Sequence, residues 1–245
     1  MQIITCAVIK GGTGKTATCG AIAQAGALEG KKVLCIDLDP QANLTSMLDA
    51  DSDRPGAAEL MQGGKAAELI QSTEQGIDII AGNNELAIDT AQNKTMTIYA
   101  LADAIEPIKK AYDLIIIDTP PAFSNLTYNA IQCATGLIIP ICADNDSYNG
   151  LLYILEVAKL IKKTNKKLHV LGCIITQYNP RTNISRLMRD IIEKNGKGVK
   201  CPLLAEIRQG VALQEARALH KNLFEYAPKS KPAQDYMKLY NEIIK

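Results

Sequence analysis

The chain has 245 residues and a mass of 26.5 kDa, a length that favours one α/β domain with its own core. Hydrophobic residues make up 47% and charged residues 22%, which argues against a mainly disordered, collagen-like or coiled-coil protein. No apolar run approaches the roughly 18 to 20 residues of a membrane span. Seven scattered cysteines without C-x-x-C spacing argue against a disulfide framework or a zinc site. We therefore expect a cytoplasmic protein.

Short apolar segments alternate with helical stretches, a pattern typical of a mostly parallel, twisted sheet flanked by helices on both faces. In chain order, the predicted strands cover residues 3–9, 33–37, 77–81, 113–118, 136–141, 169–176 and 203–207. The predicted helices cover residues 16–29, 98–111, 126–135, 148–164, 184–194 and 231–244. Residues 49–65 are rich in Asp, Gly and Ala and are expected to form a mobile insertion. The pattern predicts a single α/β domain over residues 1–245, without an N-terminal helix-turn-helix extension.

A glycine-rich loop stands between the first predicted strand and the first predicted helix. Glycines let backbone N–H groups curl inward around an anion, and the start of a helix adds the positive end of its dipole. We expect Lys15 to bind the terminal phosphates of a nucleotide and the Thr16 hydroxyl to bind Mg²⁺. The ordinary P-loop spacing fails by one residue, because Ile9 stands where its first glycine belongs. The loop consists of Lys10, Gly11, Gly12, Thr13, Gly14, Lys15 and Thr16.

This loop, with a second lysine at its start, resembles that of the deviant Walker A ATPases, which include the ParA/Soj partition proteins, MinD and the nitrogenase iron protein. The resemblance implies a P-loop NTPase fold, ATP and Mg²⁺ as cofactors, and a homodimer that forms on ATP binding. It also implies that Lys10 reaches across a nucleotide-sandwich dimer to the partner's phosphates, where it would neutralise charge during phosphoryl transfer. We therefore expect both Lys10 and Lys15 to take part in catalysis.

Acidic residues follow two predicted strands, at the edge where ligands bind in sheets of this type. Asp37 and Asp39 lie at the end of the second strand, and Asp118 follows four apolar residues. Buried strands that deliver carboxylates are how P-loop enzymes hold Mg²⁺ or its water. The segment around Asp39 resembles the D-x-D-P-Q-x-N motif of the ParA branch, which implies that Asp39 positions the attacking water and that Asp37 lies nearer the metal. The expected Mg²⁺ site consists of Thr16, Asp37 and Asp118.

Later segments also resemble the ParA/Soj branch, so the resemblance covers nearly the whole chain. The segment that begins at Thr176 is similar to the family's loop near the nucleotide base, which implies that Thr176 and Tyr178 bind the nucleotide. Near the end, the chain departs from the family's I-P-R-N-V-R-L-S-E-A pattern. Arg208 replaces the proline, Gln209 the first arginine, and Ala212 the arginine associated with non-specific DNA binding. The motif alone therefore leaves DNA binding open.

The formal net charge of +1 hides a division along the chain. Residues 1–150 hold 9 basic and 18 acidic side chains, a net of −9, whereas residues 151–245 hold 18 and 8, a net of +10. A basic surface attracts the phosphate backbone of DNA without reading its sequence, although the same charge can simply be a solvated face. The DNA contacts expected from this region are Lys197, Lys200, Arg208, Arg217 and Lys221.

The resemblance and the charge division together imply an ATP-driven switch for the partition of a plasmid, a chromosome or a mobile element. The ATP-bound dimer would bind non-specific DNA on the nucleoid, and a ParB-like or small centromere-binding partner would stimulate slow hydrolysis and release. The alternative is a MinD-like or cargo-positioning ATPase that acts on a membrane or a protein assembly without DNA. A metabolic ligase or reductase ranks third, because no residue set suggests a second substrate pocket. The last predicted helix fits packing on the sheet better than a membrane anchor, so we expect no stable membrane association.

Overall fold

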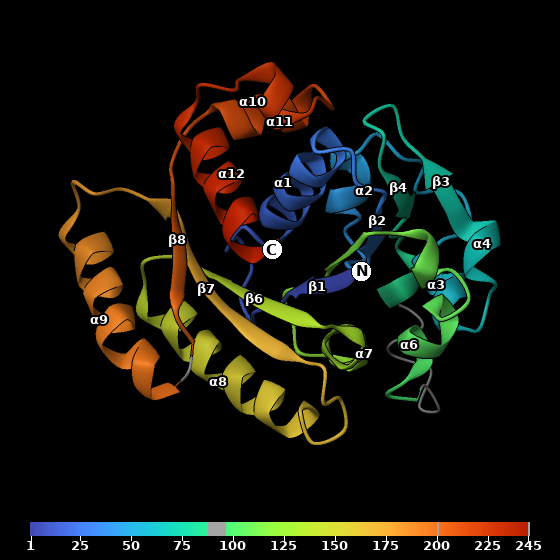
Figure 1. Cartoon of the computed structure of the whole chain (residues 1–245), viewed down its shortest axis with the longest axis horizontal. Helices are drawn as coiled ribbons and strands as arrows, with labels where there is room; N and C mark the ends of the chain where they lie inside the picture. The colour runs from blue at the N-terminus through green and yellow to red at the C-terminus, as the bar shows by residue number, and fades with distance from the viewer. Residues whose placement is uncertain (88–96, 200, 245) are drawn as a thin grey trace.

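The computed structural model describes residues 1–87, 97–199 and 201–244, and this part of the chain is built around an eight-stranded sheet (Figure 1). The strand order is β3-β4-β2-β5-β1-β6-β7-β8. Neighbouring strands are parallel, except that β3 pairs antiparallel with β4. The strands are β1 Gln2–Cys6, β2 Val33–Asp37, β3 Ile70–Ser72, β4 Asp78–Ile80, β5 Leu114–Asp118, β6 Gly136–Ile141, β7 His169–Tyr178 and β8 Leu203–Arg208.

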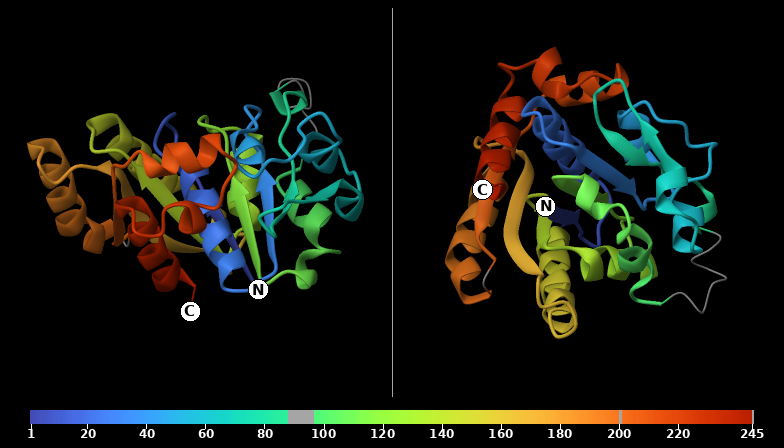
Figure 2. Two further views of the ribbon diagram at one scale, coloured as in Figure 1. Left: turned by 90° about the horizontal axis from the view of Figure 1, so that it is seen from above. Right: turned by 45° about the vertical axis from the view of Figure 1, so that its right-hand side comes forward.

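Helices cover both faces of the sheet, as the two views in Figure 2 show. One face is covered by α1 Lys15–Leu28, α2 Asn43–Met47, α10 Ala212–Ala218, α11 Leu223–Tyr226 and α12 Lys231–Ile243. The other face is covered by α3 Ala57–Met61, α4 Ala66–Leu69, α6 Ala100–Ile105, the short 3-10 helix η1 Lys109–Ala111, α7 Asn125–Cys133, α8 Asn145–Ile161 and α9 Asn183–Val199. This is the doubly covered α/β architecture that the sequence predicted.

The central strands are apolar along their length because each strand contributes to the cores on both faces. In β1, Ile4 belongs to the core under α1 and α12, whereas Ile3 belongs to the core under α3, α6 and α7. In β2, Cys35 likewise belongs to the first of these cores and Ile36 to the second. The continuous apolar runs in the sequence therefore correspond to strands that are buried on both sides.

Two predicted elements differ from the structure for local reasons. β1 ends at Cys6 instead of residue 9, because the chain leaves the sheet there to enter the glycine loop. The predicted helix over residues 98–111 is divided into α6 and η1. Pro107 lies between the two pieces and has no backbone N–H with which to continue a helix.

The segment over residues 49–65, expected as a mobile insertion, contains α3 and packs on the sheet. Four of the five residues of α3 are buried. Gly56 permits this close packing, because an added Cβ there would lie 2.2 Å from the carbonyl oxygen of Ala81. The Glu59 carboxylate accepts a hydrogen bond from the Gly56 N–H at 2.7 Å. The second half of the expected insertion is therefore part of the packed domain.

The seven parallel strands, all except β3, end together at one edge of the sheet, here named the carboxyl edge, and begin at the opposite amino edge. The glycine loop follows β1 at the carboxyl edge, and Asp37 and Asp118 are register partners at the ends of β2 and β5. Ligands of open α/β sheets bind at such an edge. Among the helices of the described residues, none has the length and apolar character required to cross a membrane.

Candidate active site

The glycine loop forms a backbone cradle at the start of α1. Gly12 and Gly14 have φ angles of 74° and 80°, left-handed values that glycine adopts readily. Gly14 also lies against β7, where an added Cβ would meet Thr176 Cγ2 at 3.1 Å. The Thr176 hydroxyl donates to the carbonyl oxygen of Thr13 at 2.8 Å. Thr176 therefore supports the shape of the loop from the neighbouring strand.

Lys15 is the buried lysine of the loop. Its Nζ donates to the carbonyl oxygen of Lys10 at 3.1 Å, and the side chain lies within range of the charges of Asp118 and Asp39. Burial lowers the pKa of this ammonium, and the two carboxylates only partly offset the effect. An anionic group bound in the cradle would restore the electrostatic stabilisation that burial removes.

Lys10 points away from the cradle toward the start of α8. Its Nζ lies 2.6 Å from Asp144 Oδ1 and 3.7 Å from Asp146 Oδ2. The hydrogen bond from Lys10 to Asp144 is the main cause that raises the pKa of Lys10. Asp144 also caps α8, because its Oδ1 accepts from the Ser147 N–H at 2.8 Å. The two lysines of the loop therefore occupy different environments, one buried and one at the surface.

Asp118 is fully buried at the end of β5. Its Oδ1 accepts from the Thr119 N–H at 3.0 Å, whereas Oδ2 has no hydrogen-bond partner among the described residues. Burial, together with the charge of Asp37, raises the pKa of Asp118 to about 7, although the nearby Thr16 hydroxyl and the charge of Lys15 oppose the rise. An unpaired buried carboxylate oxygen beside a hydroxyl fits a hard cation such as Mg²⁺, either directly or through its water.

Asp37 uses both of its oxygens to hold the segment that follows β2. Its Oδ2 accepts from the backbone N–H groups of Leu44 and Thr45 at 3.1 and 2.9 Å and from the Thr45 hydroxyl at 2.9 Å. Its Oδ1 accepts from the Asp39 N–H at 3.1 Å. Burial nevertheless raises the pKa of Asp37 to about 6. This carboxylate caps α2 and shapes the loop that carries Asp39, and its place nearer the metal stays a prediction.

Asp39 faces the cavity from that loop. Its side chain is almost buried, and Oδ1 accepts from the Gln41 N–H at 3.0 Å. Ala42, which follows, has a left-handed φ of 50° and donates its N–H to the Asp39 carbonyl oxygen at 2.9 Å. The tight turn holds the Asp39 carboxylate at the cavity wall, where it could orient a water molecule.

A cavity of about 450 Å³ connects the glycine loop with the segment after β8. This volume lies within the range typical of small-ligand sites. Five of the expected site residues are absent from its lining among the described residues: Lys10, Asp37, Asp118, Tyr178 and Lys221. The lining includes Gly11, Gly12, Thr13, Gly14, Lys15, Thr16, Asp39, Gln41, Asn43, Thr176, Gln177, Arg208, Gln209, Gly210, Gln214 and Arg217.

Tyr178, expected to bind the nucleotide, lies instead in the apolar core beside α9. The register between β7 and β8 shifts between Ile175 and Tyr178, and Gln177 has a left-handed φ of 52°. This irregularity directs Tyr178 to the face away from the cavity. Gln177 lines the cavity in its place, and its Nε2 donates to the Gly12 carbonyl oxygen at 2.9 Å.

Arg208, expected at a DNA surface, forms a two-point ion pair with Asp235 of α12. Its Nε and Nη2 lie 2.8 Å from Asp235 Oδ2 and Oδ1, and its backbone N–H donates to Oδ2 at 2.9 Å. Asp235 is almost buried. The charge of Arg208 is therefore neutralised within the protein, and the pair fixes the cavity-lining loop after β8 to α12. The pairing with Asp235 argues against Arg208 as a free DNA contact.

Arg217 also has a different place from the one expected. Its Nη2 donates to Asn43 Oδ1 at 2.6 Å, so the side chain joins α10 to the start of α2 beside the cavity. Of the other expected DNA contacts, Lys221 is exposed, whereas the side chain of Lys197 and the whole of Lys200 lie outside the described part of the chain. Arg217 therefore belongs to the cavity wall. The sequence offered no signal for it, because the contact joins residues 174 positions apart.

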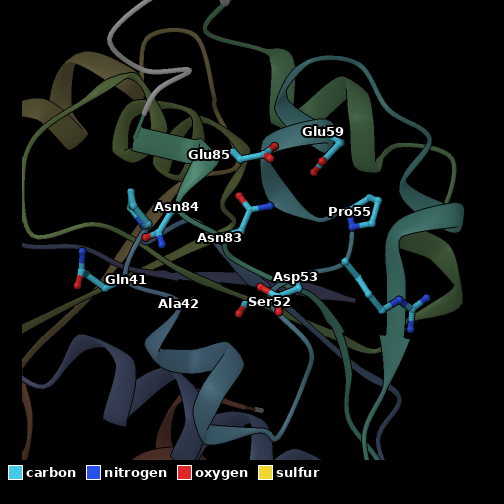
Figure 3. Close-up of a pocket in the computed structure, with 11 residues that line it drawn as sticks. Gln41, Ala42, Ser52, Asp53, Pro55, Glu59, Asn83, Asn84 and Glu85 are labelled. Atoms are coloured by element: carbon cyan, nitrogen blue, oxygen red, sulfur yellow. The ribbon is translucent and has the colours of Figure 1, made fainter.

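A second cavity, of about 540 Å³, adjoins the first at the carboxyl edge (Figure 3). Gln41 lines both cavities. The carboxyl groups of Asp53, Glu59 and Glu85 surround the second cavity, and the carboxamide of Asn83 lies between them. This surface is polar and carries more acidic than basic side chains, which makes the carboxyl edge unfavourable for a polyanion outside the glycine loop.

Replacing Arg217 by alanine is expected to weaken ATP binding about tenfold, the effect of losing one charged hydrogen-bonding group of the cavity wall. Lys221→Ala, which removes the same charge from an exposed position close in the sequence, is the matched control and should leave the affinity unchanged. Isothermal titration of each variant with ATP and Mg²⁺ provides the measurement. Equal dissociation constants for the two variants would remove Arg217 from the nucleotide site.

Comparison with known proteins agrees with this geometry. The family described as AAA domain matches residues 1–170. The chromosome-partitioning ATPase Soj of Thermus thermophilus is 31% identical over 240 residues, which cover 96% of this chain and 92% of Soj.

Two solved structures share the fold over almost all of the chain. Cobyrinic acid a,c-diamide synthase from Mycobacterium smegmatis, with bound ADP and magnesium, has a TM-score of 0.84 at 27% identity and covers 98% of this chain and 93% of its own. MinD from Pyrococcus horikoshii, complexed with Mg-ADP, has a TM-score of 0.80 at 26% identity and covers 100% of this chain and 96% of its own. The chain therefore belongs to the AAA-domain P-loop ATPases, in the deviant Walker A group that contains Soj, ParA and MinD, with ATP and Mg²⁺ as its cofactors.

Proposed function

We propose that this ATPase is a partition switch whose ATP-bound dimer binds non-specific DNA. The observation that carries the proposal is that the two lysines of the glycine loop occupy different environments. Lys15 is buried beside Asp118, whereas Lys10 stands at the surface with 31% of its side chain exposed. A lone subunit needs only the inner lysine to bind phosphates. An outer lysine on the same loop fits a facing subunit whose nucleotide it would contact.

Within one subunit, the site residues would divide the work as follows. Lys15 and the N–H groups of the glycine loop would bind the phosphates. Thr16 and Asp118 would hold Mg²⁺, which neutralises phosphate charge when bound. Asp39 would orient the attacking water, and Thr176 would keep the loop in shape.

Formation of the dimer requires Lys10 to leave Asp144. The side chains of this ion pair are 31% and 39% exposed, so water screens their attraction. Such pairs contribute about 0 to 1 kcal/mol, which leaves the lysine free to exchange partners. The contact with Asp144 is therefore compatible with a resting position of Lys10 in the monomer and a second position against a partner's phosphate.

Similarity to a chromosome-partitioning ATPase supports DNA as the surface to which the dimer binds and the nucleoid as the location of the protein. We further propose that a ParB-like or small centromere-binding protein stimulates hydrolysis and releases the dimer, since a switch needs slow turnover in the absence of its partner. The likeness to MinD supports the alternative of a positioning ATPase that acts without DNA. The DNA measurement below distinguishes the two functions.

With ATP and Mg²⁺, the particle mass is expected to double from the 26.5 kDa of one chain, and mixed-sequence duplex DNA should then be shifted in a native gel. With ADP, both effects should be absent. The affinity for DNA should fall steeply with salt, because phosphate contacts release counterions. Light scattering and a gel-shift titration at two salt concentrations provide the data. A dimer that binds no DNA at low salt would favour the positioning ATPase, and the lack of any dimer would refute the switch.

A further inference from the structure

The charge of the described residues is divided between the two edges of the sheet. Exposed acidic side chains lie at the carboxyl edge around the two cavities, where Asp53, Glu85 and Asp146 are examples. The expected basic surface of the C-terminal region is reduced there, because Arg208 is paired and Arg217 lines the cavity. A larger group of exposed basic side chains lies at the opposite edge of the sheet.

Eight lysines lie at the amino edge, in the segments that precede the strands β2, β5 and β7. Two directly precede β2, two lie in η1 before β5, and four lie between α8 and β7. All are exposed or partly exposed. We name this set the amino-edge lysines: Lys31, Lys32, Lys109, Lys110, Lys162, Lys163, Lys166 and Lys167.

Contacts between the loops show that these lysines share one surface. The Lys32 N–H donates to Asp113 Oδ2 at 3.0 Å, which joins the loop before β2 to the loop before β5. Lys109 pairs with Glu106, whose pKa is lowered by Lys109 first and also by Lys110 and Lys167. Lys167 therefore lies within electrostatic range of η1, although the two loops are far apart in the sequence.

The strands β2, β5, β1, β6 and β7 are consecutive in the sheet, so the amino-edge lysines follow a row of five strand starts. At about 4.8 Å between strands, the row spans about 19 Å. A DNA duplex presents one phosphate charge per roughly 1.7 Å of axis, so the row matches a length of duplex that carries about eleven charges. The neighbouring acids Glu29, Glu106 and Asp113 are fewer than the lysines, which leaves this edge positive.

We propose that the amino-edge lysines bind the phosphate backbone of duplex DNA. This inference rests on the proposed function and identifies the surface that would carry out its DNA-binding step. The nucleotide cavity lies at the opposite edge of the same sheet, so DNA and ATP do not compete for space.

Figure 2 shows the two ends of the chain close together, and the Gln2 side chain donates to the Ile243 carbonyl oxygen at 3.3 Å. Both ends lie at the amino edge, because β1 starts there.

The arrangement also gives a physical reason for ATP dependence. In a dimer that meets through its carboxyl edges, the two amino edges face away from each other. Each subunit then presents one DNA surface, so the dimer can hold two separate segments of a long, folded DNA, and binding of the first segment raises the effective concentration of the second. A monomer has one weak, salt-sensitive surface.

The test compares two variants that lose equal charge. The first replaces Lys162, Lys163, Lys166 and Lys167 with glutamine, and the matched control replaces the exposed Lys221, Lys229, Lys231 and Lys238 with glutamine. Fluorescence anisotropy with a mixed-sequence duplex, ATP and Mg²⁺ gives the dissociation constant at several salt concentrations. We expect the first variant to bind at least about tenfold more weakly, with a salt slope smaller by up to about 0.9 for each lost contact. The control should stay close to the parent protein.

The named outcomes separate the inference from the function on which it rests. If the parent protein binds DNA and the first variant binds equally well, the amino-edge surface is refuted while the partition switch stands. Equal losses in both variants would also refute it, because they would indicate a diffuse charge effect. A parent protein that binds vesicles containing anionic lipid but no DNA would refute both. A second variant, Lys109→Gln with Lys110→Gln, should also weaken DNA binding, so that the inference stays testable if the fourfold variant fails to fold. The thermal unfolding temperature of each variant shows whether it is folded.

Discussion

Replacing Lys15 by alanine is expected to abolish ATP binding, whereas Lys10→Ala should retain appreciable binding but fail to form the ATP-dependent dimer. Lys15 is buried in the glycine loop, and its charge is the one that faces bound phosphates. Lys10, at the start of the loop, lies outside the cavity lining in a partly exposed pair with Asp144, so its loss removes no contact within the subunit's own cavity. Charge-assisted hydrogen bonds to phosphate are among the strongest polar contacts in proteins, so the effect at Lys15 should be large.

Isothermal titration with ATP and light scattering with Mg²⁺ measure the two properties separately. Lys65→Ala is a suitable control, because Lys65 is an exposed lysine paired with Glu68 outside both cavities. If Lys10→Ala forms the dimer as the parent protein does, the sandwich arrangement is wrong. If Lys15→Ala binds ATP with unchanged affinity, the glycine loop is not the phosphate site.

Replacing Asp39 by asparagine should leave ATP binding and dimer formation intact and lower the rate of hydrolysis about 10²- to 10⁴-fold, the usual contribution of a group that accepts a proton or orients water. Asparagine keeps an Oδ1 acceptor for the Gln41 N–H, so the loop conformation should be maintained. Only the negative charge at the cavity wall is lost. We therefore expect the substitution to slow the chemical step of hydrolysis and to leave the binding of ATP unchanged.

A phosphate-release assay under single-turnover conditions measures this rate. Asp53→Asn is the matched control. Asp53 is an exposed carboxylate of the neighbouring cavity, and its substitution removes the same charge. Parent-like hydrolysis by Asp39→Asn would exclude Asp39 from the reaction. Loss of ATP binding in that variant would assign Asp39 a structural role instead.

The fold and the centre of the site could be predicted because they depend on short segments of sequence. The glycine loop is continuous in the chain, and Asp118 ends an apolar run that must be a buried strand. Parallel strands end at one edge, so local patterns suffice to bring Lys15, Thr16 and Asp118 together. The same reasoning did not show that Asp37 also caps α2, because α2 is a five-residue helix without a periodic pattern.

The other contacts that the sequence did not predict join distant segments or follow a local break in periodicity. The Asp235 partner of Arg208 and the Asn43 partner of Arg217 come from other elements, and charge alone could not show that these arginines are engaged within the protein. Tyr178 was misplaced because strand alternation fails at Gln177, whose left-handed φ nothing in the sequence indicates. A prediction from residue type and spacing cannot account for partners that only the tertiary fold supplies.

The position of β5 determines the order in which the molecule can assemble. β1 and β2 are the first strands to be synthesised, but they do not pair with each other, because β5 lies between them. β1 pairs only with β5 and β6, and Gln2 is in register with Leu114, more than a hundred residues later. Contacts of such long range slow folding and leave early strands exposed to misassociation. On the ribosome, the phosphate-binding loop is therefore made early but can reach its final shape only after residues 114–118 have emerged and joined the sheet.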